Sequence, residues 1–204
     1  SLVGSEMCIR DRVEGIVCSG ECRGRQHTYA LLDERVPPTP ELTKEEALAR
    51  LATAYFRSHA PATLQDFSWW SGLPLTEARQ SISLLEPELM SEQWNSQTWY
   101  IHDSCRTAGK ATGNLHLLPS YDEYLIGYKD RTDVLPKEDY SKAFTNNGLF
   151  FPVLLYKGHV VGNWNKASKK KEIFPEHSLF RKDICLEEEL LNQAKEKYVR
   201  FLTH

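Results

Sequence analysis

The sequence lacks a long hydrophobic run. Its mean hydropathy is −0.50, and no apolar stretch approaches the roughly 20 residues that span a bilayer. It also lacks a secretory signal, because no segment combines a positive start, an apolar middle and a small-residue cleavage site. These absences exclude a membrane protein and predict a cytoplasmic one.

An excess of positive charge is missing as well. The 204 residues include 25 Lys and Arg against 28 Asp and Glu, which gives a net charge of −3. Nucleic-acid-binding domains usually show a basic excess on the bound surface. Any DNA-binding function must therefore rest on local charge and on motifs.

The cysteines form no framework of pairs. There are five of them, at scattered positions, and an odd, scattered set is typical of a reducing compartment. Cys18, Cys22 and His27 lie close in sequence, but a structural zinc site needs four ligands. We therefore expect no metal and no cofactor.

The first twelve residues, SLVGSEMCIRDR, begin at Ser1 and show neither periodicity nor a targeting pattern. They resemble translated sequencing-adapter read-through, which predicts a non-native leader over residues 1–12. A flexible native N-terminus is the alternative, because termini are usually loosely held. The next segment, 13–36, contains β-prone runs at 16–18 and 27–32 around a polar turn with Arg23 and Arg25. This pattern predicts a hairpin with a basic tip.

A prolyl linker at 37–40 precedes a complete predicted domain over residues 41–104. Capping residues predict helices beginning after Thr43 and Thr63, and Gly72 and Pro74 separate the second helix from a third. That third helix would turn Leu75, Ala78, Ile82 and Leu85 inward. Two β-prone runs, 89–94 and 97–102, then form a hairpin. The order is that of a winged helix-turn-helix, although a three-helix bundle with a hairpin has the same pattern.

The remaining predicted domain, 114–204, changes character. A strand at 115–118 precedes a helix that Ser120 and Glu123 would cap and that runs toward Tyr128. Residues 130–147 are predicted as a polar surface excursion, and 150–164 as a hairpin. A helix over 187–202 would turn Leu190, Leu191, Ala194, Tyr198 and Phe201 inward. The fold class is therefore α+β, a winged helix followed by a small β-rich, partial-barrel domain with a C-terminal helix.

Four blocks in one order support a family resemblance: CSGECRGRQHTYALLDERVP, YFRSHAPATLQDFSWWSGLPLTEAR, LLPSYDEYLIGYKDR and NGLFFPVLLYKGHVVGNW. From about residue 15 onward the chain resembles the winged-helix DNA-binding family of AlkZ-like and YcaQ-like alkylpurine DNA glycosylases. The resemblance implies tandem winged helices and a β-rich domain around a DNA channel. It also implies that the opening hairpin is the wing of a truncated winged helix.

The resemblance implies a DNA glycosylase for alkylated or crosslinked purines, acting on double-stranded and possibly damaged DNA. The family's catalytic Gln-x-Gln or Gln-x-Asp motif lies near the N-terminus of the full protein. No Gln-x-Gln occurs here, and Gln65 and Asp66 are adjacent rather than spaced, so no catalytic residue is assigned. We expect an inactive, monomeric fragment of an enzyme; the alternative is a non-catalytic winged-helix binding or regulatory module.

Candidate DNA contacts are basic or polar residues on predicted tips, helix faces and loops. They are Arg23, Arg25, Arg79, Gln80, Ser83, Lys129, Arg131, Lys169 and Lys170. Each has a simpler interpretation as a solvated side chain, and Arg131 has an ion pair with Asp130 as its alternative. Asp122, Tyr128 and Trp69 are candidate channel-lining residues. Trp69 would either pack against the neighbouring domain or stack on a base.

Overall fold

The structure is a computed structural model that describes residues 9–24, 26–38, 40–105, 114–169 and 172–203. The chain divides into two compact units, with the division between Thr43 and Lys44. Unit 1 comprises residues up to Thr43, and unit 2 comprises Lys44–His204. None of the helices in the described ranges is both long and apolar enough to cross a membrane.

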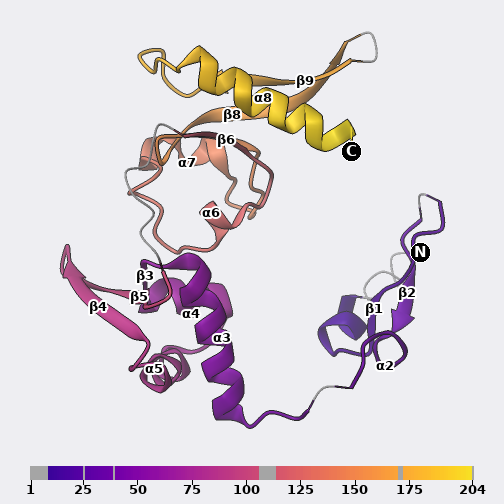
Figure 1. The fold of residues 1–204 in the computed structure, drawn as a ribbon, viewed down its shortest axis with the longest axis vertical. Coiled ribbons are helices and arrows are strands. Elements are labelled where there is room, and N and C mark those ends of the chain that lie inside the picture. Colours follow the sequence, from indigo (N-terminus) through magenta and orange to yellow (C-terminus); the bar gives the residue numbers. More distant parts are fainter. Residues whose placement is uncertain (1–8, 25, 39, 106–113, 170–171, 204) are drawn as a thin grey trace. The chain divides into compact units, whose positions relative to one another are not determined.

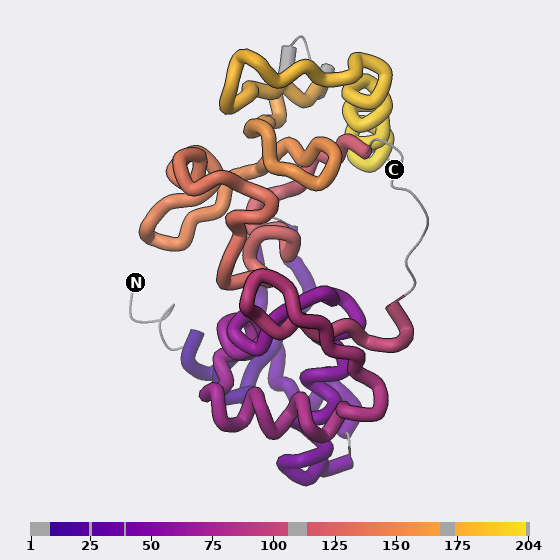
Figure 2. The backbone as a smooth tube through the Cα atoms, turned by 90° about the vertical axis from the view of Figure 1, so that its left-hand side faces the viewer, coloured from indigo at the N-terminus to yellow at the C-terminus, as the bar shows by residue number. Residues whose placement is uncertain are grey.

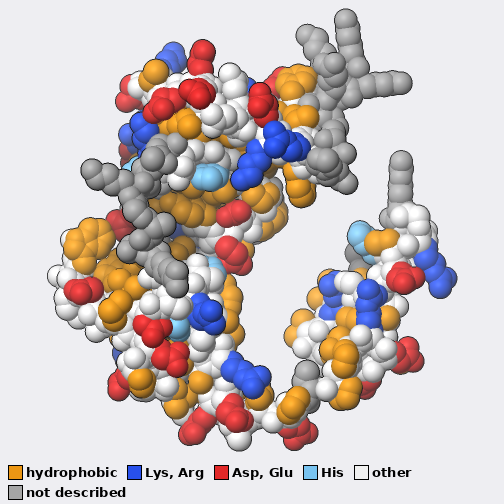
Figure 3. Space-filling model, in the orientation of Figure 1, with side chains coloured by type: hydrophobic (Ala, Val, Ile, Leu, Met, Phe, Trp, Pro, Cys, Tyr) orange, Lys and Arg blue, Asp and Glu red, His pale blue; other side chains and the backbone are white. Residues whose placement is uncertain are grey.

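Unit 1 is a hairpin with short helical turns on either side. Residues 9–13 are helical, and β1 (Val17–Ser19) pairs antiparallel with β2 (Tyr29–Leu31). This confirms the predicted hairpin. The second run is shorter than predicted, because α2 (Leu32–Arg35) begins directly after it. No described residue of unit 1 is buried, and Figure 3 shows apolar side chains on its surface.

Unit 2 begins with a helical module over residues 44–105. Its elements are α3 (Lys44–His59), β3 (Ala62–Thr63), α4 (Leu64–Ser71), α5 (Leu75–Leu84), β4 (Leu89–Trp94) and β5 (Gln97–His102). The strands form one antiparallel sheet in the order β3-β5-β4. The predicted order of helices and hairpin is confirmed (Figure 1).

Local capping explains where these elements begin and end. The Thr63 side chain accepts from Asp66 N, and the Asp66 carboxylate accepts from Thr63 N, which completes a capping box at α4. Gly72 ends this helix with a φ of 71°, a left-handed conformation that glycine adopts without steric cost. Asn95 and Ser96 both have positive φ, which matches the turn that a two-residue hairpin needs.

The core of the helical module is aromatic and lies between α3, α4 and α5. Its buried residues are Ala52, Tyr55, Phe56, Ala62, Phe67, Ala78, Ile82 and Leu85. The predicted inward face of α5 is therefore correct except at Leu75, which is 45% exposed. Leu75 is the first residue of the helix, so its exposure is a matter of its place at the helix end and not of its face, which it shares with the buried Ile82.

The sheet module, residues 114–203, forms the other end of unit 2 (Figure 2). Its strands are β6 (Leu115–Leu118), β7 (Val153–Tyr156), β8 (His159–Lys169) and β9 (Glu172–Leu179). They pair antiparallel in the order β6-β7-β8-β9 as an open sheet. Helix α8 (Glu188–Thr203) packs over β6 and β9. The mixture of helices with antiparallel sheets confirms the α+β class.

Short helices fill the segment between β6 and β7. They are α6 (Glu123–Ile126), the 3₁₀ helix η1 (Lys137–Asp139) and α7 (Tyr140–Ala143). The prediction of a surface excursion over 130–147 is wrong, because Leu135, Asp139 and Ala143 are buried. The inward face predicted for the last helix fails at Phe201, which is 78% exposed. Tyr198 does pack inward, with its ring 4.8 Å from that of Trp164.

Candidate nucleic-acid interface and its pocket

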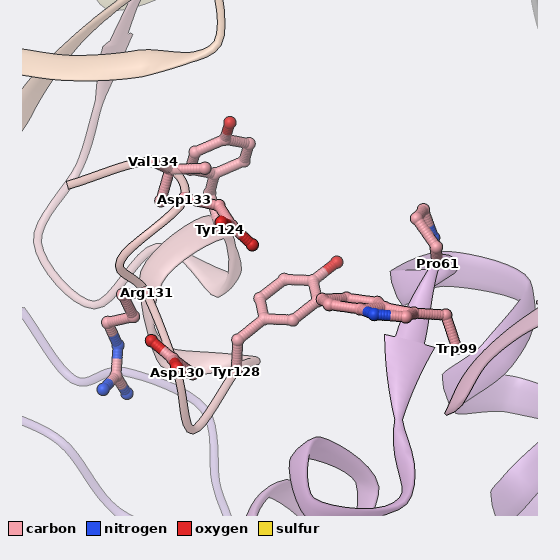
Figure 4. Close-up of a pocket in the computed structure, with 8 residues that line it drawn as sticks. All are labelled: Pro61, Trp99, Tyr124, Tyr128, Asp130, Arg131, Asp133 and Val134. Carbon is pink, nitrogen blue, oxygen red and sulfur yellow. The ribbon is translucent and has the colours of Figure 1, made fainter. Parts of the chain in front are cut away.

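A cavity of about 180 Å³ lies between the β4–β5 hairpin and the segment that follows α6. Figure 4 shows rings on both of its sides, whereas both carboxylates come from the side of Tyr124 and Tyr128. The lining residues are Pro61, Trp99, Tyr124, Tyr128, Asp130, Arg131, Asp133 and Val134. An aromatic wall next to carboxylates suits a planar ligand with positive charge.

Strand alternation brings Trp99 to this cavity. Tyr100 packs against the helical core, so its neighbour Trp99 projects from the opposite face of β5. There its ring lies 5.9 Å from the ring of Trp94. Trp99 Nε1 is buried and has no hydrogen-bond partner within the described part of the chain. A buried donor without an acceptor costs free energy.

Two tyrosine rings of the cavity are held in place by their hydroxyl groups. Tyr128 Oη donates to the His59 carbonyl at 2.7 Å, and Tyr124 Oη donates to the Gly158 carbonyl at 2.8 Å. Burial raises the pKa of both hydroxyls, that of Tyr128 to about 12. Both side chains are therefore neutral near pH 7, and their rings are fixed before any ligand arrives.

Asp66 fixes the backbone of the cavity wall. Its Oδ2 accepts from Thr63 N at 3.0 Å and from Thr63 Oγ1 at 2.7 Å, while Oδ1 accepts from Lys129 N at 2.9 Å. The residue is only 3% exposed. One buried carboxylate thus caps α4 and also holds the segment that contains Tyr128 and Asp130.

The two carboxylates of the cavity differ in their partners. Asp130 Oδ1 accepts from Thr132 N and Thr132 Oγ1, at 2.9 and 2.8 Å, and these hydrogen bonds lower the pKa of Asp130. The Asp133 side chain is exposed. The Asp133 carboxylate makes no hydrogen bond or ion pair with any described residue. Asp133 is therefore the carboxylate of the cavity that has no partner among the described residues.

Arg131 points away from the other lining residues (Figure 4). It is 8% exposed, its Nε donates to the Leu125 carbonyl, and its Cζ lies 5.4 Å from the Phe144 and Phe150 ring centroids. This burial lowers the pKa of Arg131. The structure corrects the expectation that Arg131 contacts the DNA backbone, because its guanidinium is enclosed. The alternative ion pair with Asp130 is not formed between these described residues either.

A second cavity, of about 420 Å³, adjoins the first. Both are lined by Trp99, Asp130 and Asp133, and the second adds Lys129 and Lys137. Its remaining lining residues are Thr63, Gln65, Asp66, Gln97 and Tyr140. Rings and carboxylates therefore line both cavities, whereas the two lysine side chains line only the second of them.

A buried histidine joins the two modules behind the cavity. His59 Nδ1 lies 2.8 Å from Ser58 Oγ, and His59 Nε2 lies 3.2 Å from Glu123 Oε2. Trp70 Nε1 donates to the same Glu123 oxygen at 3.2 Å. A Cβ added at Gly127 would lie 2.6 Å from His59 Cδ2, so only glycine permits this close approach.

The predicted cap of α6 is wrong. Ser120 and Glu123 were expected to form it, but Asp122 Oδ1 accepts from Tyr124 N at 2.9 Å. Helix α6 also ends at Ile126, before Tyr128. Asp122, a candidate channel-lining residue, therefore has a structural role at the start of α6. Glu123 is free to accept from the helical module because it is not used in the cap.

The predicted contacts on α5 share one exposed face. Arg79, Gln80 and Ser83 are all exposed, and Ser83 Oγ donates to the carbonyls of Arg79 and Gln80 at 3.1 Å. This leaves the arginine and glutamine side chains as the long polar groups of that face. Lys129 is also exposed, on the second cavity.

The other predicted contacts lie in unit 1 or in segments that the structure does not describe in full. Arg23 belongs to unit 1 and is exposed. Arg25 and Lys170 lie outside the described residues, and so does the side chain of Lys169, whose backbone belongs to β8.

Of the candidate channel-lining residues, Tyr128 lines the first cavity. Trp69 is 55% exposed, its Nε1 donates to the Ile126 carbonyl at 3.4 Å, and its ring centroid lies 5.9 Å from Arg131 Cζ. It therefore contacts the sheet module, as the first of its two predicted roles requires. Trp99, Asp133 and Asp66 were not predicted as site residues. The alternation of β5 was the available signal for Trp99, since Tyr100 on the other face is core-facing.

Alkaline conditions are expected to destabilise unit 2 through the buried tyrosines. The pKa of Tyr128 is about 12 in the folded protein, against about 10 in an unfolded chain. Above about pH 10 the unfolded state therefore binds fewer protons than the folded state, and the free energy of unfolding falls until the pH passes the folded pKa. Each such tyrosine lowers it by at most about 1.4 kcal/mol per pH unit. Urea unfolding at about pH 8, 10 and 11, followed by tryptophan fluorescence, measures this slope.

In that experiment Tyr128→Phe should show a shallower decline than the parent. Tyr121→Phe is the control, because Tyr121 is 51% exposed. Equal slopes for Tyr128→Phe and the parent would show that the buried hydroxyl does not cause the decline.

Comparison with known proteins places the chain in a family. A family model described as "DNA glycosylase AlkZ-like" matches residues 10–201. The solved structure of the DNA glycosylase AlkZ of Streptomyces sahachiroi has a similar fold, with a TM-score of 0.75 and 22% sequence identity. The match covers 88% of this chain and 50% of the AlkZ chain, so the chain spans about half the length of that relative. A comparison with curated proteins found no match. The chain belongs to the AlkZ-like DNA glycosylase family.

Proposed function

We propose that this chain is a DNA-binding part of a glycosylase that acts on alkylated or crosslinked purines in double-stranded DNA. The helical module would be a winged helix in which α5 is the recognition helix and β4–β5 the wing. The observation that supports this most is the division of α5 into two faces. Ala78 and Ile82 are buried, while Arg79 and Gln80 are exposed.

The chemistry of those exposed groups fits DNA. An arginine forms paired hydrogen bonds with guanine or with a phosphate, and a glutamine does so with adenine. The net charge of −3 restricts attraction to such local groups, so we expect weak, salt-sensitive binding. The chain contains neither Gln-x-Gln nor Gln-x-Asp. We propose that it does not itself release bases, and that it binds as a monomer in the cytoplasm.

Binding to a fluorescent duplex tests the proposal. Anisotropy titrations between about 50 and 200 mM salt should give a log affinity that falls with log salt, by about 0.9 per neutralised phosphate. Arg79→Ala should reduce both the affinity and this slope, because it removes one contact. Arg50→Ala, the same change at an exposed position of α3, is the control. A flat salt response, or equal losses in both variants, would contradict the assignment of α5.

A further inference from the structure

A third cavity, of about 490 Å³, lies on the outer face of the β4–β5 hairpin, the face opposite the helical core. Its lining residues are Pro61, Glu92, Trp94, Trp99, Ile101 and Asp133. The geometry points to a binding site for the guanidinium of an arginine that belongs to a partner peptide. None of the lining residues comes from α5, so this site is separate from the proposed DNA contacts.

Strand register places aromatic and acidic side chains of the hairpin on this one face. Tyr100 packs into the helical core, so Trp99 projects from the outer face. Glu92 pairs directly with Trp99, and Trp94 pairs with Gln97 two positions away, which puts all of these side chains on the same face. The ring centroids of Trp94 and Trp99 lie 5.9 Å apart, with an angle of 56° between the rings. The hairpin thus presents two neighbouring rings beside a carboxylate.

Two carboxylates of the cavity are without partners. Glu92 and Asp133 are both exposed, and neither makes a hydrogen bond or an ion pair with any described residue. Asp133 lies on the wall opposite Trp99 (Figure 4). The charges therefore flank the rings from both walls. Such an arrangement attracts a cation and repels the phosphates of DNA.

The basic residues of the neighbouring second cavity do not neutralise this pair of carboxylates. Lys129 and Lys137 line the second cavity but not the third, and within the described chain neither forms an ion pair. Hydrogen bonds from Thr132 lower the pKa of Asp130, and the charge of Lys137 adds to this effect. Lys137 therefore acts on Asp130, which is not a lining residue of the third cavity.

A guanidinium fits this arrangement better than an ammonium group. It is planar and weakly hydrated, it stacks on aromatic rings, and it pairs with a carboxylate through two parallel hydrogen bonds. A lysine ammonium is a compact and strongly hydrated charge. An arginine also has an apolar stem, which Pro61 and Ile101 would cover. Stacked on Trp99, its guanidinium would lie between Glu92 and Asp133.

The test uses the Nα-acetyl amide of arginine, with the matching amides of citrulline and lysine as comparison probes. Citrulline has nearly the shape of arginine but a neutral urea group. The probes are titrated into the isotope-labelled full chain, and shifts of the indole N–H signals in NMR spectra give the dissociation constants. We expect the arginine probe to bind about tenfold more tightly than the citrulline probe, since a partly desolvated cation–π contact provides about that factor. The lysine probe should bind more weakly than the arginine probe.

Variants separate the contributions of charge and stacking. Asp133→Asn and Glu92→Gln should each weaken binding of the arginine probe about threefold and leave the citrulline probe unaffected. Trp99→Ala should weaken both probes. Trp94→Ala should do the same at a ring that is 55% exposed, so that a folding defect in Trp99→Ala does not decide the result. Glu86→Gln, the same charge change at an exposed residue outside the three cavities, is the control.

Three results with the probes would overturn the inference: equal affinities for arginine and citrulline, lysine binding as tight as arginine, or an arginine preference that persists in both charge variants. The duplex titration is repeated with Trp94→Ala. Unchanged duplex affinity supports a separate site for a partner peptide. A loss as large as that of Arg79→Ala would assign this face to DNA and overturn the inference, while the proposed function would stand.

Discussion

Replacing Tyr55 with alanine is expected to destabilise unit 2 by about 3–5 kcal/mol, the range for removing a buried aromatic side chain. Tyr55 is 0% exposed and stacks on His59 with ring centroids 4.7 Å apart. Phe67 and Trp70 lie at 5.3 and 5.0 Å. The alanine variant loses all of these contacts and leaves a cavity where the helical and sheet modules meet.

The hydroxyl of Tyr55 provides a matched control. It donates to the Gly127 carbonyl at 3.0 Å, so Tyr55→Phe keeps the packing and loses one hydrogen bond, at a cost of about 1 kcal/mol. All five tryptophans lie in unit 2, and urea unfolding followed by their fluorescence measures both variants. Met90→Ala, at a residue 56% exposed, should change stability by less than about 0.5 kcal/mol. If Tyr55→Ala costs no more than Tyr55→Phe, the ring does not stabilise this junction.

Features that depend on neighbours in sequence could be predicted from the sequence. The strands at Leu89–Trp94 and Gln97–His102 have the predicted bounds, because alternation and a two-residue turn define a hairpin locally. The cap at Thr63 and the break at Gly72 are local in the same sense. The cap at Thr63 and the break at Gly72 are both determined by residues within one helical turn.

Features that depend on distant residues could not be predicted. Glu123 looked like a capping residue because Ser120 precedes it by three positions, yet it binds His59 and Trp70 from another module. Arg131 looked like a surface cation, but the rings of Phe144 and Phe150 enclose it. Local pattern does not distinguish these cases, since burial is decided by packing against residues far away in the chain.

The candidate site was predicted only in part for the same reason. Tyr128 and Lys129 were selected and do line the cavities. Trp99 was treated as part of the hairpin, and the role of Asp133 becomes visible only when the segment after α6 lies against β5. The first cavity is lined by three segments, at Pro61, at Trp99 and at 124–134, and none of them has a recognisable motif alone.

Replacing Asp66 with alanine is expected to cost about 2–4 kcal/mol. The carboxylate is buried and accepts from Thr63 N and Lys129 N. Loss of an N-cap interaction costs about 1 kcal/mol, and each buried donor left without an acceptor costs about 1–3 kcal/mol. Gln65→Ala, at an exposed position in the same first turn, should be nearly neutral.

Hydrogen exchange separates the two roles of Asp66. If it both caps α4 and holds the cavity wall, the Lys129 amide should exchange faster in Asp66→Ala than the variant's lower global stability explains. Asp66→Asn should show an intermediate loss of stability. Its side-chain oxygen can still accept one hydrogen bond, but its amide NH₂ group replaces the other acceptor and faces a donor. If exchange of the Lys129 amide is accelerated only as much as the loss of global stability predicts, Asp66 does not hold the cavity wall. The wall of the cavity would then be held by Tyr128 and its bond to the His59 carbonyl rather than by Asp66.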